Sequence, residues 1–204
     1  DITMFGARTG TLNDGAVQDA WSMQQSTLWP DKILSIPVGD YQITSTLANT
    51  TTTRFRVEGV GRGIGNSSNG ALGISRLTMN TADTPIFSIT GADNSVVGLS
   101  LVYNAIHTTA QTNAACIWHN QISNLSRSVF RDLHMAKGSY GYCSTGLTSG
   151  IYDANNNWDN ILVDSYSQSA LYFGSSGTTM RLNHIYVQNL QNNVAVLNDT
   201  ATIS

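Results

Sequence analysis

Short apolar segments separated by polar turns run along the second half of the chain, and one arrangement recurs. A glycine or polar residue is followed by an apolar residue and, two places later, by a second apolar residue, in segments 98–101, 132–135, 160–163 and 184–187. The first apolar residues of these segments are 34, 28 and 24 residues apart: Leu99, Leu133, Ile161 and Ile185. Another apolar residue stands three positions before each: Val96, Phe130, Trp158 and Leu182. Repeats of this length with two or three short strands predict a solenoid in which these residues stack.

A second apolar column is expected ten residues after the first. Its members are Cys143, Leu171 and Ala195, and Ile117 takes this place in the preceding repeat. In that repeat the number of residues between the two columns is larger, which indicates a loop of about eight extra residues. Three residues after the second column we expect turns that need a left-handed backbone, at Asn120, Gly146, Gly174 and Asn198.

One helix is predicted near the start of the chain. Ile2 to Phe5 reads as a short strand, and Asn13 or Asp14 is a suitable N-cap for a helix over residues 15–28. The apolar positions of this segment fall on one helical face: Val17, Ala20, Trp21 and Leu28. Pro30-Asp31 ends the helix. Because the first repeat of a solenoid would expose an apolar end and an unpaired strand edge, we expect this helix to cover it.

Strands and turns follow the helix up to about residue 65. An apolar strand over 33–36 leads into a turn at 37–40, and a strand resumes at Tyr41. Phe55 and Val57 alternate with charged residues, which indicates a strand with one buried side. The glycines at 59, 61, 63 and 65 are not spaced for phosphate binding, and no helix follows them.

Together these residues resemble the N-terminal region of the pectate-lyase-like superfamily, in the branch with bacteriophage tailspikes and secreted polysaccharide-degrading enzymes. The matching pieces are Phe5-Gly6-Ala7, Asn13-Asp14, Ile36-Pro37-x-Gly39-x-Tyr41 and Val57-x-Gly59-x-Gly61. The resemblance implies a right-handed parallel β-helix. For the phage members it implies a homotrimer that binds, and often cleaves, bacterial surface glycans.

We therefore expect an all-β fold, a right-handed single-stranded parallel β-helix (solenoid) with an N-terminal capping α-helix. It forms a single domain over residues 1–204, with the cap and first coils in 1–65 and the stacked coils in 66–204. The last repeat shows no capping element, so we expect the native chain to continue beyond Ser204.

The composition suits a β-rich surface and argues against several functions. Only 11% of the residues are charged, and Asn, Ser, Thr and Gly carry the polar load. A net charge of −3 argues against nucleic-acid binding, which needs clustered Lys and Arg. No apolar run approaches the length that spans a bilayer, so we expect no membrane insertion. Cys116 and Cys143 read as small buried residues, although a disulfide between them is not excluded.

Acidic residues in the repeats are the candidates for glycan cleavage, which needs a carboxylate pair. We select Asp132, Asp159 and Asp164 as candidate catalytic residues. In the alignment of repeats, Asp132, Asn160 and His184 form one outward stack, and Arg131, Asp159 and Asn183 form the stack beside it. The alternative is an ordinary polar stack in which Arg131 pairs with Asp159. The motifs of pectin-hydrolysing relatives are absent, and so are a calcium-binding acidic cluster and a Gly-x-Ser-x-Gly elbow.

Aromatic and basic residues at outward positions are candidates for substrate binding. This set comprises Trp118, Arg131, His134, Tyr172, His184 and Tyr186. Sugars stack on exposed rings through their apolar C–H faces, but Tyr and Trp are also enriched in subunit interfaces. No His or acidic residue stands at metal-ligand spacing, so we expect no metal site and no cofactor.

The function expected from these observations is that of a phage tailspike-like protein that recognises a bacterial surface polysaccharide as a homotrimer. Whether it also degrades the polysaccharide is left open. One alternative is a secreted polysaccharide lyase or glycoside hydrolase, and another is a purely structural virion or adhesin segment. The expected location is the virion or the extracellular space.

Overall fold

The computed structural model describes residues 1–26, 32–49, 54, 56–62, 73–108, 111–120, 123–144, 151, 153–174, 179–188, 194–198 and 202–203. The chain begins with a 3₁₀ helix, η1 (Ile2–Phe5), where we expected a strand. The Asp1 carboxylate accepts from the Thr3 N–H, and Gly6 closes the turn with a left-handed φ of 93°. These two local contacts favour a helical turn over an extended segment.

The predicted helix is present as α1 (Asp14–Gln24), and its buried face includes Val17, Ala20 and Trp21 as expected. Leu28, the last residue of the predicted face, lies outside the described residues. Asn13 occupies the N-cap position but makes no side-chain cap bond. Its side chain instead bonds backbone groups of Arg8 and Thr11, which fixes the entry to the helix.

Parallel strands make up most of the rest of the described chain, in three sheets. The first sheet runs in the order β1-β4-β8-β11-β14-β16-β18, with β2 and β5 attached to it. Its strands are β1 (Ile33–Ile36), β2 (Gly39–Ile43), β4 (Arg56–Gly59), β5 (Ser75–Met79), β8 (Ser95–Tyr103), β11 (Val129–Ala136), β14 (Asn157–Asp164), β16 (Thr179–Gln188) and β18 (Thr202–Ile203).

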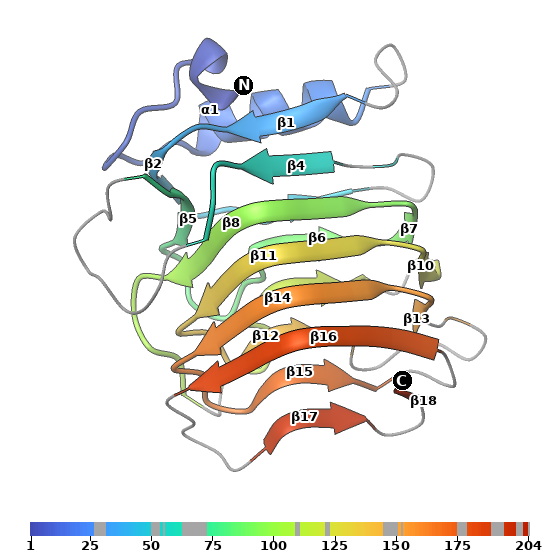
Figure 1. Ribbon diagram of the computed structural model, residues 1–204. Coiled ribbons are helices and arrows are strands. Elements are labelled where there is room, and N and C mark those ends of the chain that lie inside the picture. Colours follow the sequence, from blue (N-terminus) through green and yellow to red (C-terminus); the bar gives the residue numbers. More distant parts are fainter. Residues whose placement is uncertain are drawn as a thin grey trace.

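The second and third sheets are smaller. The second contains β3 (Leu47–Ala48), β6 (Phe87–Ile89), β9 (Ala115–His119), β12 (Tyr140–Cys143), β15 (Ser169–Phe173) and β17 (Val194–Asn198). The third contains β7 (Gly91–Ala92), β10 (Leu125–Ser126) and β13 (Asp153–Ala154). From β6 to β14 the chain visits the second, third and first sheets in turn, three times over. The fold is therefore all-β with parallel sheets, and α1 lies at one end of the first sheet, next to β1 (Figure 1).

The register confirms the first predicted column. Phe130 pairs with Trp158 and Trp158 with Leu182, while Leu133 pairs with Ile161 and Ile161 with Ile185. The Phe130 and Trp158 rings stack with centroids 4.0 Å apart. Such aromatic pairs contribute roughly 0.5–1.5 kcal/mol beyond the area that they bury.

The second predicted column is wrong by one residue in two repeats. Tyr142, Leu171 and Val196 are aligned with one another, and Ile117 is aligned with Tyr142, whereas Cys143 is aligned with Tyr172. The distance along the chain between the two columns grows by one residue in each repeat, from nine to ten to eleven. A constant spacing of ten therefore fits only the middle repeat.

Left-handed residues stack at fixed positions of the first sheet, although not where we expected them. Gly98, Asp132, Asn160 and His184 have φ values of 69°, 54°, 55° and 50°. Each interrupts a strand between two inward residues, so two consecutive residues face outward there. Gly174, which was expected to be left-handed, is not. A Cβ on Gly174 would lie 2.7 Å from the Tyr172 ring, so lack of space rather than φ disfavours a side chain there. Gly146 lies outside the described residues.

Neither cysteine is in a disulfide and both are fully buried, as expected for small buried residues. Cys116 belongs to the main core, and burial raises the pKa of its thiol to about 12. Cys143 belongs instead to a small cluster with Ala115 and Tyr140, against which Trp118 and Tyr172 pack. Within the described part of the chain, no helix has the length and apolar character needed to cross a membrane.

Candidate functional site

The outer face of the first sheet carries most of the residues that the sequence singled out. Five polar side chains from β11, β14 and β16 lie there in two neighbouring sets of contacts, which we together call the outer ladder: Arg131, Asp132, Asp159, Asn160 and His184. Their inward neighbours are fully buried in the core, for example Phe130 and Leu133 in β11. The stacked left-handed residues place consecutive polar side chains on the outer side of each strand.

Contacts within the outer ladder join neighbouring strands and, at Arg131 and Asp132, consecutive residues of one strand. The Asn160 amide donates to Asp132 Oδ1 at 2.6 Å, and Arg131 Nε lies 3.4 Å from Asp132 Oδ2. His184 Nδ1 lies 3.0 Å from Asp159 Oδ1. The alternative Arg131–Asp159 ion pair is therefore not formed, although these two residues are register partners. The left-handed backbone at Asp132 brings its carboxylate beside Arg131, which pairs with it. The Asp159 carboxylate is bound by His184 instead.

Two carboxylates of the ladder remain accessible to solvent. The side chains of Asp132 and Asp159 are 40% and 33% exposed, and they come from adjacent strands. Each is oriented by a nitrogen donor of a neighbouring strand. The arrangement offers hydrogen-bond acceptors and donors in a row along the sheet, which is the chemistry that sugar hydroxyls require.

Asp164, the third candidate acid, lies elsewhere on the same sheet. It stands at the end of β14, is 1% exposed, and accepts a hydrogen bond from the Ser165 hydroxyl at 2.9 Å. Its charge acts on His134, which is also a predicted site residue. The three candidate acids are therefore divided between two groups of side chains.

His134 is at the centre of the second group, which we call the His134 cluster: Arg62, Arg76, Ser100, His134, Asp164 and Tyr186. His134 Nδ1 lies 3.0 Å from Ser100 Oγ, and the side chain faces the outer side of β11 although it is only 2% exposed. Burial lowers the pKa of His134 to about 4, the charges of Arg76 and Arg62 act in the same direction, and Asp164 opposes them. His134 is therefore a neutral imidazole at neutral pH.

Arg62 and Arg76 belong to this cluster and were not selected from the sequence. Arg76 Nη1 lies 3.9 Å from Asp40 Oδ2. The guanidinium carbon of Arg62 lies 5.8 Å from the centre of the Tyr186 ring, and Tyr186 is 50% exposed. The only sequence signal for Arg62 was its place in the glycine-rich turn before residue 63, which we had examined only for phosphate binding.

Two of the predicted aromatic residues lie on a different sheet. Trp118 is in β9 and Tyr172 is in β15, and both pack half-buried against Tyr140 and Cys143 on the outer side of the second sheet. Tyr186 alone of the three predicted aromatic residues lies on the first sheet. The structure thus does not bring Trp118 and Tyr172 to the outer ladder.

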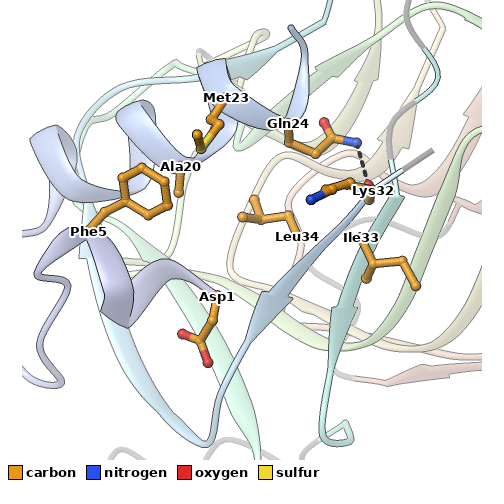
Figure 2. A pocket seen from close by; sticks show the side chains of 8 residues that line it. All are labelled: Asp1, Phe5, Ala20, Met23, Gln24, Lys32, Ile33 and Leu34. Atoms are coloured by element: carbon orange, nitrogen blue, oxygen red, sulfur yellow. Dashed lines mark hydrogen bonds between the residues drawn. The ribbon is translucent and has the colours of Figure 1, made fainter. Parts of the chain in front are cut away.

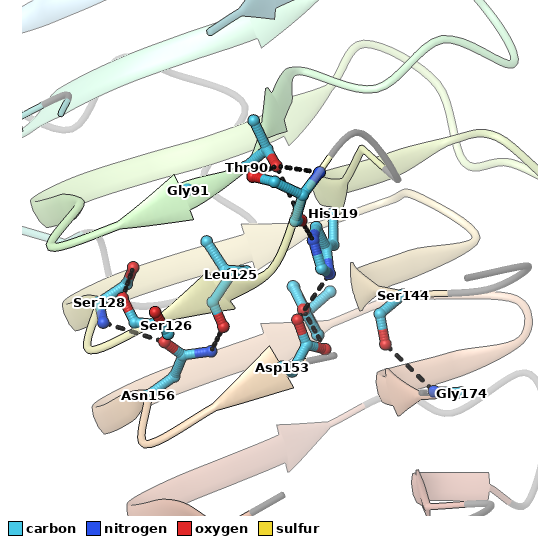
Figure 3. A network of polar contacts seen from close by, with 12 residues as sticks. Thr90, Gly91, His119, Leu125, Ser126, Ser128, Ser144, Asp153, Asn156 and Gly174 are labelled. Carbon is cyan, nitrogen blue, oxygen red and sulfur yellow. Dashed lines mark hydrogen bonds and ion pairs between the residues drawn. The ribbon is translucent and has the colours of Figure 1, made fainter. Parts of the chain in front are cut away.

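The interior holds a polar group that the sequence did not reveal. His119 Nδ1 lies 2.6 Å from Asp153 Oδ1, and both side chains are fully buried (Figure 3). The Tyr142 hydroxyl donates to Asp153 Oδ2 at 2.7 Å, and His119 Nε2 lies 2.7 Å from the Ser123 carbonyl oxygen. Both ring nitrogens therefore lie close to oxygen atoms. Burial and the Asp153 charge raise the pKa of Tyr142 well above its ordinary value.

Nearby side chains tie the repeats together around this interior group. The Asn156 amide donates to the Leu125 carbonyl at 3.1 Å, and the Ser128 N–H donates to Asn156 Oδ1 at 2.9 Å (Figure 3). All of these side chains are buried away from solvent. We assign the interior network to stability rather than to binding.

A cavity of about 170 Å³ lies at the N-terminal end of the structure, between η1, α1 and β1 (Figure 2). It is lined mainly by apolar side chains, with Asp1, Gln24 and Lys32 at its edges. The Gln24 amide already donates to the Lys32 carbonyl at 3.1 Å. None of the predicted site residues lines this cavity. Among the described residues, no group of three or more His, Cys, Asp or Glu side chains could hold a metal ion.

Comparisons with known proteins leave the family open. No protein-family model matches the chain, and no curated protein matches it. Among solved structures, one similar chain is described as a "putative glycosyl hydrolase" from Parabacteroides merdae. It is 12% identical with a TM-score of 0.49, and the match covers 99% of this chain and 94% of that one. Another is ORF18 of Geobacillus virus E2, which is 13% identical with a TM-score of 0.38. That match covers 93% of this chain but only 52% of the virus chain.

Proposed function

We propose that this protein is a tailspike-like right-handed parallel β-helix that recognises a bacterial surface polysaccharide through the outer face of its first sheet. The observation that carries the proposal is the outer ladder. It presents carboxylate, amide, imidazole and guanidinium groups on three adjacent strands, with the exposed Tyr186 ring on the last of them. We further propose that the protein acts as a homotrimer on a virion or outside the cell.

The winding of the chain supports a β-helix. Parallel pairing joins each strand to its counterpart in the next repeat in all three sheets. Crossover connections between parallel strands of one sheet are right-handed in the great majority of proteins, because of the twist of the strands. The resemblance of the first 65 residues to the pectate-lyase-like superfamily points to the same winding.

The spacing of the ladder suits an extended chain of sugars. Neighbouring strands in a sheet are about 4.8 Å apart, so side chains at equivalent positions form regularly spaced rows. A few well-placed polar groups fix the orientation of a ligand, while an aromatic ring supplies apolar contact. The ladder and Tyr186 offer both along the same face.

Binding to purified capsular and O-antigen polysaccharides from a panel of bacteria tests the proposal. We expect at least one polysaccharide to bind, and Asp159→Ala to weaken its binding about tenfold, because His184 loses its partner and the sugar loses an acceptor. Asp83→Ala is the matched control, since Asp83 is an exposed carboxylate bonded to Asn113 away from the ladder. Equal effects of the two substitutions, or a panel without any binding, would contradict the proposal.

Glycan cleavage is a second candidate function, and the two accessible carboxylates Asp132 and Asp159 favour it. On a polysaccharide that binds, release of reducing ends would indicate cleavage. A new ultraviolet absorbance from an unsaturated sugar would further distinguish a lyase from a hydrolase. Asp132→Asn and Asp159→Asn should each abolish cleavage while the fold is kept. If cleavage persists in both variants, these residues are not the acid and base.

The oligomeric state has its own test. Light scattering of the purified protein should give the mass of three chains. A monomer at the concentrations used for binding would count against the trimeric, tailspike-like assembly. It would leave the assignment of the glycan-binding face untouched.

A further inference from the structure

We propose that Arg62 and His134 form a binding site for an oxyanion, the carboxylate or sulfate group of an acidic sugar. This inference rests on the proposed glycan-binding function, which it deepens by naming the chemical class of the ligand. It concerns the His134 cluster, beside the outer ladder on the same face of the first sheet.

Two donor groups of this cluster each have a buried nitrogen atom without a hydrogen-bond partner in the described part of the chain and without an ion pair to a carboxylate. They are Arg62 Nη1 and His134 Nε2. Buried polar atoms in proteins almost always have partners, and leaving a charged donor without one is costly. For comparison, Arg127 bonds both oxygens of Asp93, at 2.9 and 3.0 Å. An Arg and a His that both lack acceptors on one face point to an acceptor supplied by a ligand.

Backbone contacts hold Arg62 over the outer face. The Val60 N–H donates to Ser75 Oγ at 2.8 Å, and the Gly61 N–H donates to the Gly98 carbonyl at 2.9 Å. Gly98 belongs to the same left-handed stack as Asp132 and His184 in the outer ladder. These bonds fix the segment that carries Arg62 against the first sheet, with its guanidinium near Tyr186.

His134 and Tyr186 belong to one row of outward residues. His134 is the register partner of Leu162, and Leu162 is the register partner of Tyr186. With a strand spacing of about 4.8 Å, the ring of Tyr186 is two strands from His134. Arg62 lies over that ring and its charge also acts on His134, so the guanidinium and the imidazole belong to the same part of the outer face.

The chemistry of the two groups matches an oxyanion. In the tautomer that accepts the Ser100 hydroxyl at Nδ1, the neutral imidazole of His134 presents an N–H at Nε2. A guanidinium presents N–H groups in a planar fork that suits carboxylate and sulfate oxygens. Arg76 is already beside Asp40, so it adds positive potential without being free to bind the ligand. The negative charge of Asp164 repels anions from the cluster. A bound anion must therefore be held by hydrogen bonds to both Arg62 and His134, and not by charge attraction alone.

This site also explains the place of Tyr186. Its half-exposed ring could stack against the apolar face of a sugar while Arg62 bonds the acidic group of that sugar. The outer ladder would then contact the hydroxyl groups of neighbouring sugars. The two groups of side chains thus divide recognition between charge and hydroxyl pattern.

Three probes test the inference: hyaluronate oligosaccharides, which carry carboxylates, dextran sulfate, and uncharged dextran. Calorimetry at one fixed ionic strength should show binding of at least one acidic probe, about tenfold tighter than that of dextran. Arg62→Gln should remove that difference. Arg56→Gln is the matched control, because it removes one positive charge from β4 without touching the cluster. The better of the two acidic probes identifies the oxyanion as carboxylate or sulfate.

Ring signals of His134 in NMR spectra give a readout that is independent of affinity. The chain has four histidines, so His134→Gln assigns the signal by its loss. We expect the His134 signal to shift with the acidic probe and not with dextran, and the shift to disappear in Arg62→Gln. An unshifted signal, or equal losses of affinity in Arg62→Gln and Arg56→Gln, would overturn the inference.

Failure of this inference can be told apart from failure of the proposed function. If polysaccharides bind and Asp159→Ala weakens them, but acidic and neutral probes bind alike, the oxyanion site is wrong and the function stands. If no bacterial polysaccharide binds, while sodium glucuronate or sodium sulfate shifts His134 in an Arg62-dependent way, the oxyanion site stands and the function is wrong.

Discussion

Two histidine–aspartate pairs in this protein have the same chemistry and opposite surroundings. His119 and Asp153 are fully buried, with Nδ1 and Oδ1 2.6 Å apart. His184 and Asp159 lie on the outer face, 3.0 Å apart, with side chains 70% and 33% exposed. Each pair joins strands of different repeats. The inner pair is enclosed by Tyr142 and the Ser123 carbonyl, whereas the outer pair keeps faces open to solvent.

The difference shows how one type of contact serves two purposes. Removing one partner of a buried pair leaves the other charged or unpaired inside the protein, which is strongly destabilising. Removing one partner of an exposed pair returns the other to water at little cost. The inner pair should therefore matter for stability, and the outer pair for what binds to the face. The predictions below test this contrast.

The largest effect should follow from removing the inner carboxylate. Asp153→Ala leaves His119 and the Tyr142 hydroxyl without their shared acceptor. We expect the free energy of unfolding to fall by about 3–5 kcal/mol. Denaturant unfolding measures it. Asp153→Asn is the informative companion, since an amide can bond a neutral His119 and Tyr142 together and should cost much less. Equal losses in the two variants would show that the pair stabilises by its charge.

The pH dependence of stability should single out His134, a buried histidine on the outer side without a paired carboxylate. Its pKa is about 4 in the folded protein and 6.5 in the unfolded chain. The unfolded chain therefore takes up this proton first as the pH falls. The contribution of neutral His134 to the free energy of unfolding is complete above pH 6.5. It is lost between pH 6.5 and 4, by about 3 kcal/mol in all.

Unfolding of the wild type and of His134→Gln at a series of pH values measures this difference. The two stability curves should converge as the pH falls through this window, because only the wild type has the buried imidazole. His184→Gln is the control, since His184 is exposed. Parallel curves for the wild type and His134→Gln would contradict the lowered pKa.

A smaller effect on stability should follow from adding a side chain at Gly98, in the stack of residues with a left-handed backbone. Gly98 has a φ of 69°, and a Cβ on it would lie 2.8 Å from the Gly59 carbonyl oxygen. Gly98→Ala should cost roughly 1–2 kcal/mol from the backbone conformation alone, with the close contact adding to it. Gly61→Ala, where a Cβ meets nothing within 4 Å, should be nearly neutral. The melting temperatures of the two variants provide the comparison.

The smallest effect on stability should come from the outer pair. Asp159→Ala should change the free energy of unfolding by about 0–1 kcal/mol, because both partners can be solvated. The same substitution should have its main effect on polysaccharide binding. A loss comparable with that of Asp153→Ala would erase the contrast between the two pairs.

Much of the repeat could be predicted because inward positions follow a simple rule. Phe130, Trp158 and Leu182 must be apolar to face the core, and that requirement is visible in the chain itself. The second column was misplaced because a corner can gain one residue without any change in its polarity. The strand expected at Ile2 to Phe5 was wrong because the capping contact of Asp1 with Thr3 outweighed the apolar pattern.

The candidate site was predicted only in part. Asp132, Asp159, Arg131 and His184 were correctly placed together, since repeat alignment alone puts them in neighbouring outward rows. Their pairing was not foreseen, because which donor reaches which carboxylate depends on side-chain direction at a left-handed residue. Arg62 was missed because it lies outside the repeats and reaches the face through the fold.

The sequence by itself determined the β-rich class, the capping helix and the order in which inward residues stack. These depend on local periodicity and on the need to bury apolar side chains, which every repeat shares. Only the tertiary structure decided that one His–Asp pair is inside and the other outside. Whether a histidine is buried depends on which distant segments of the chain pack over it. The residues next to it in the sequence do not show this.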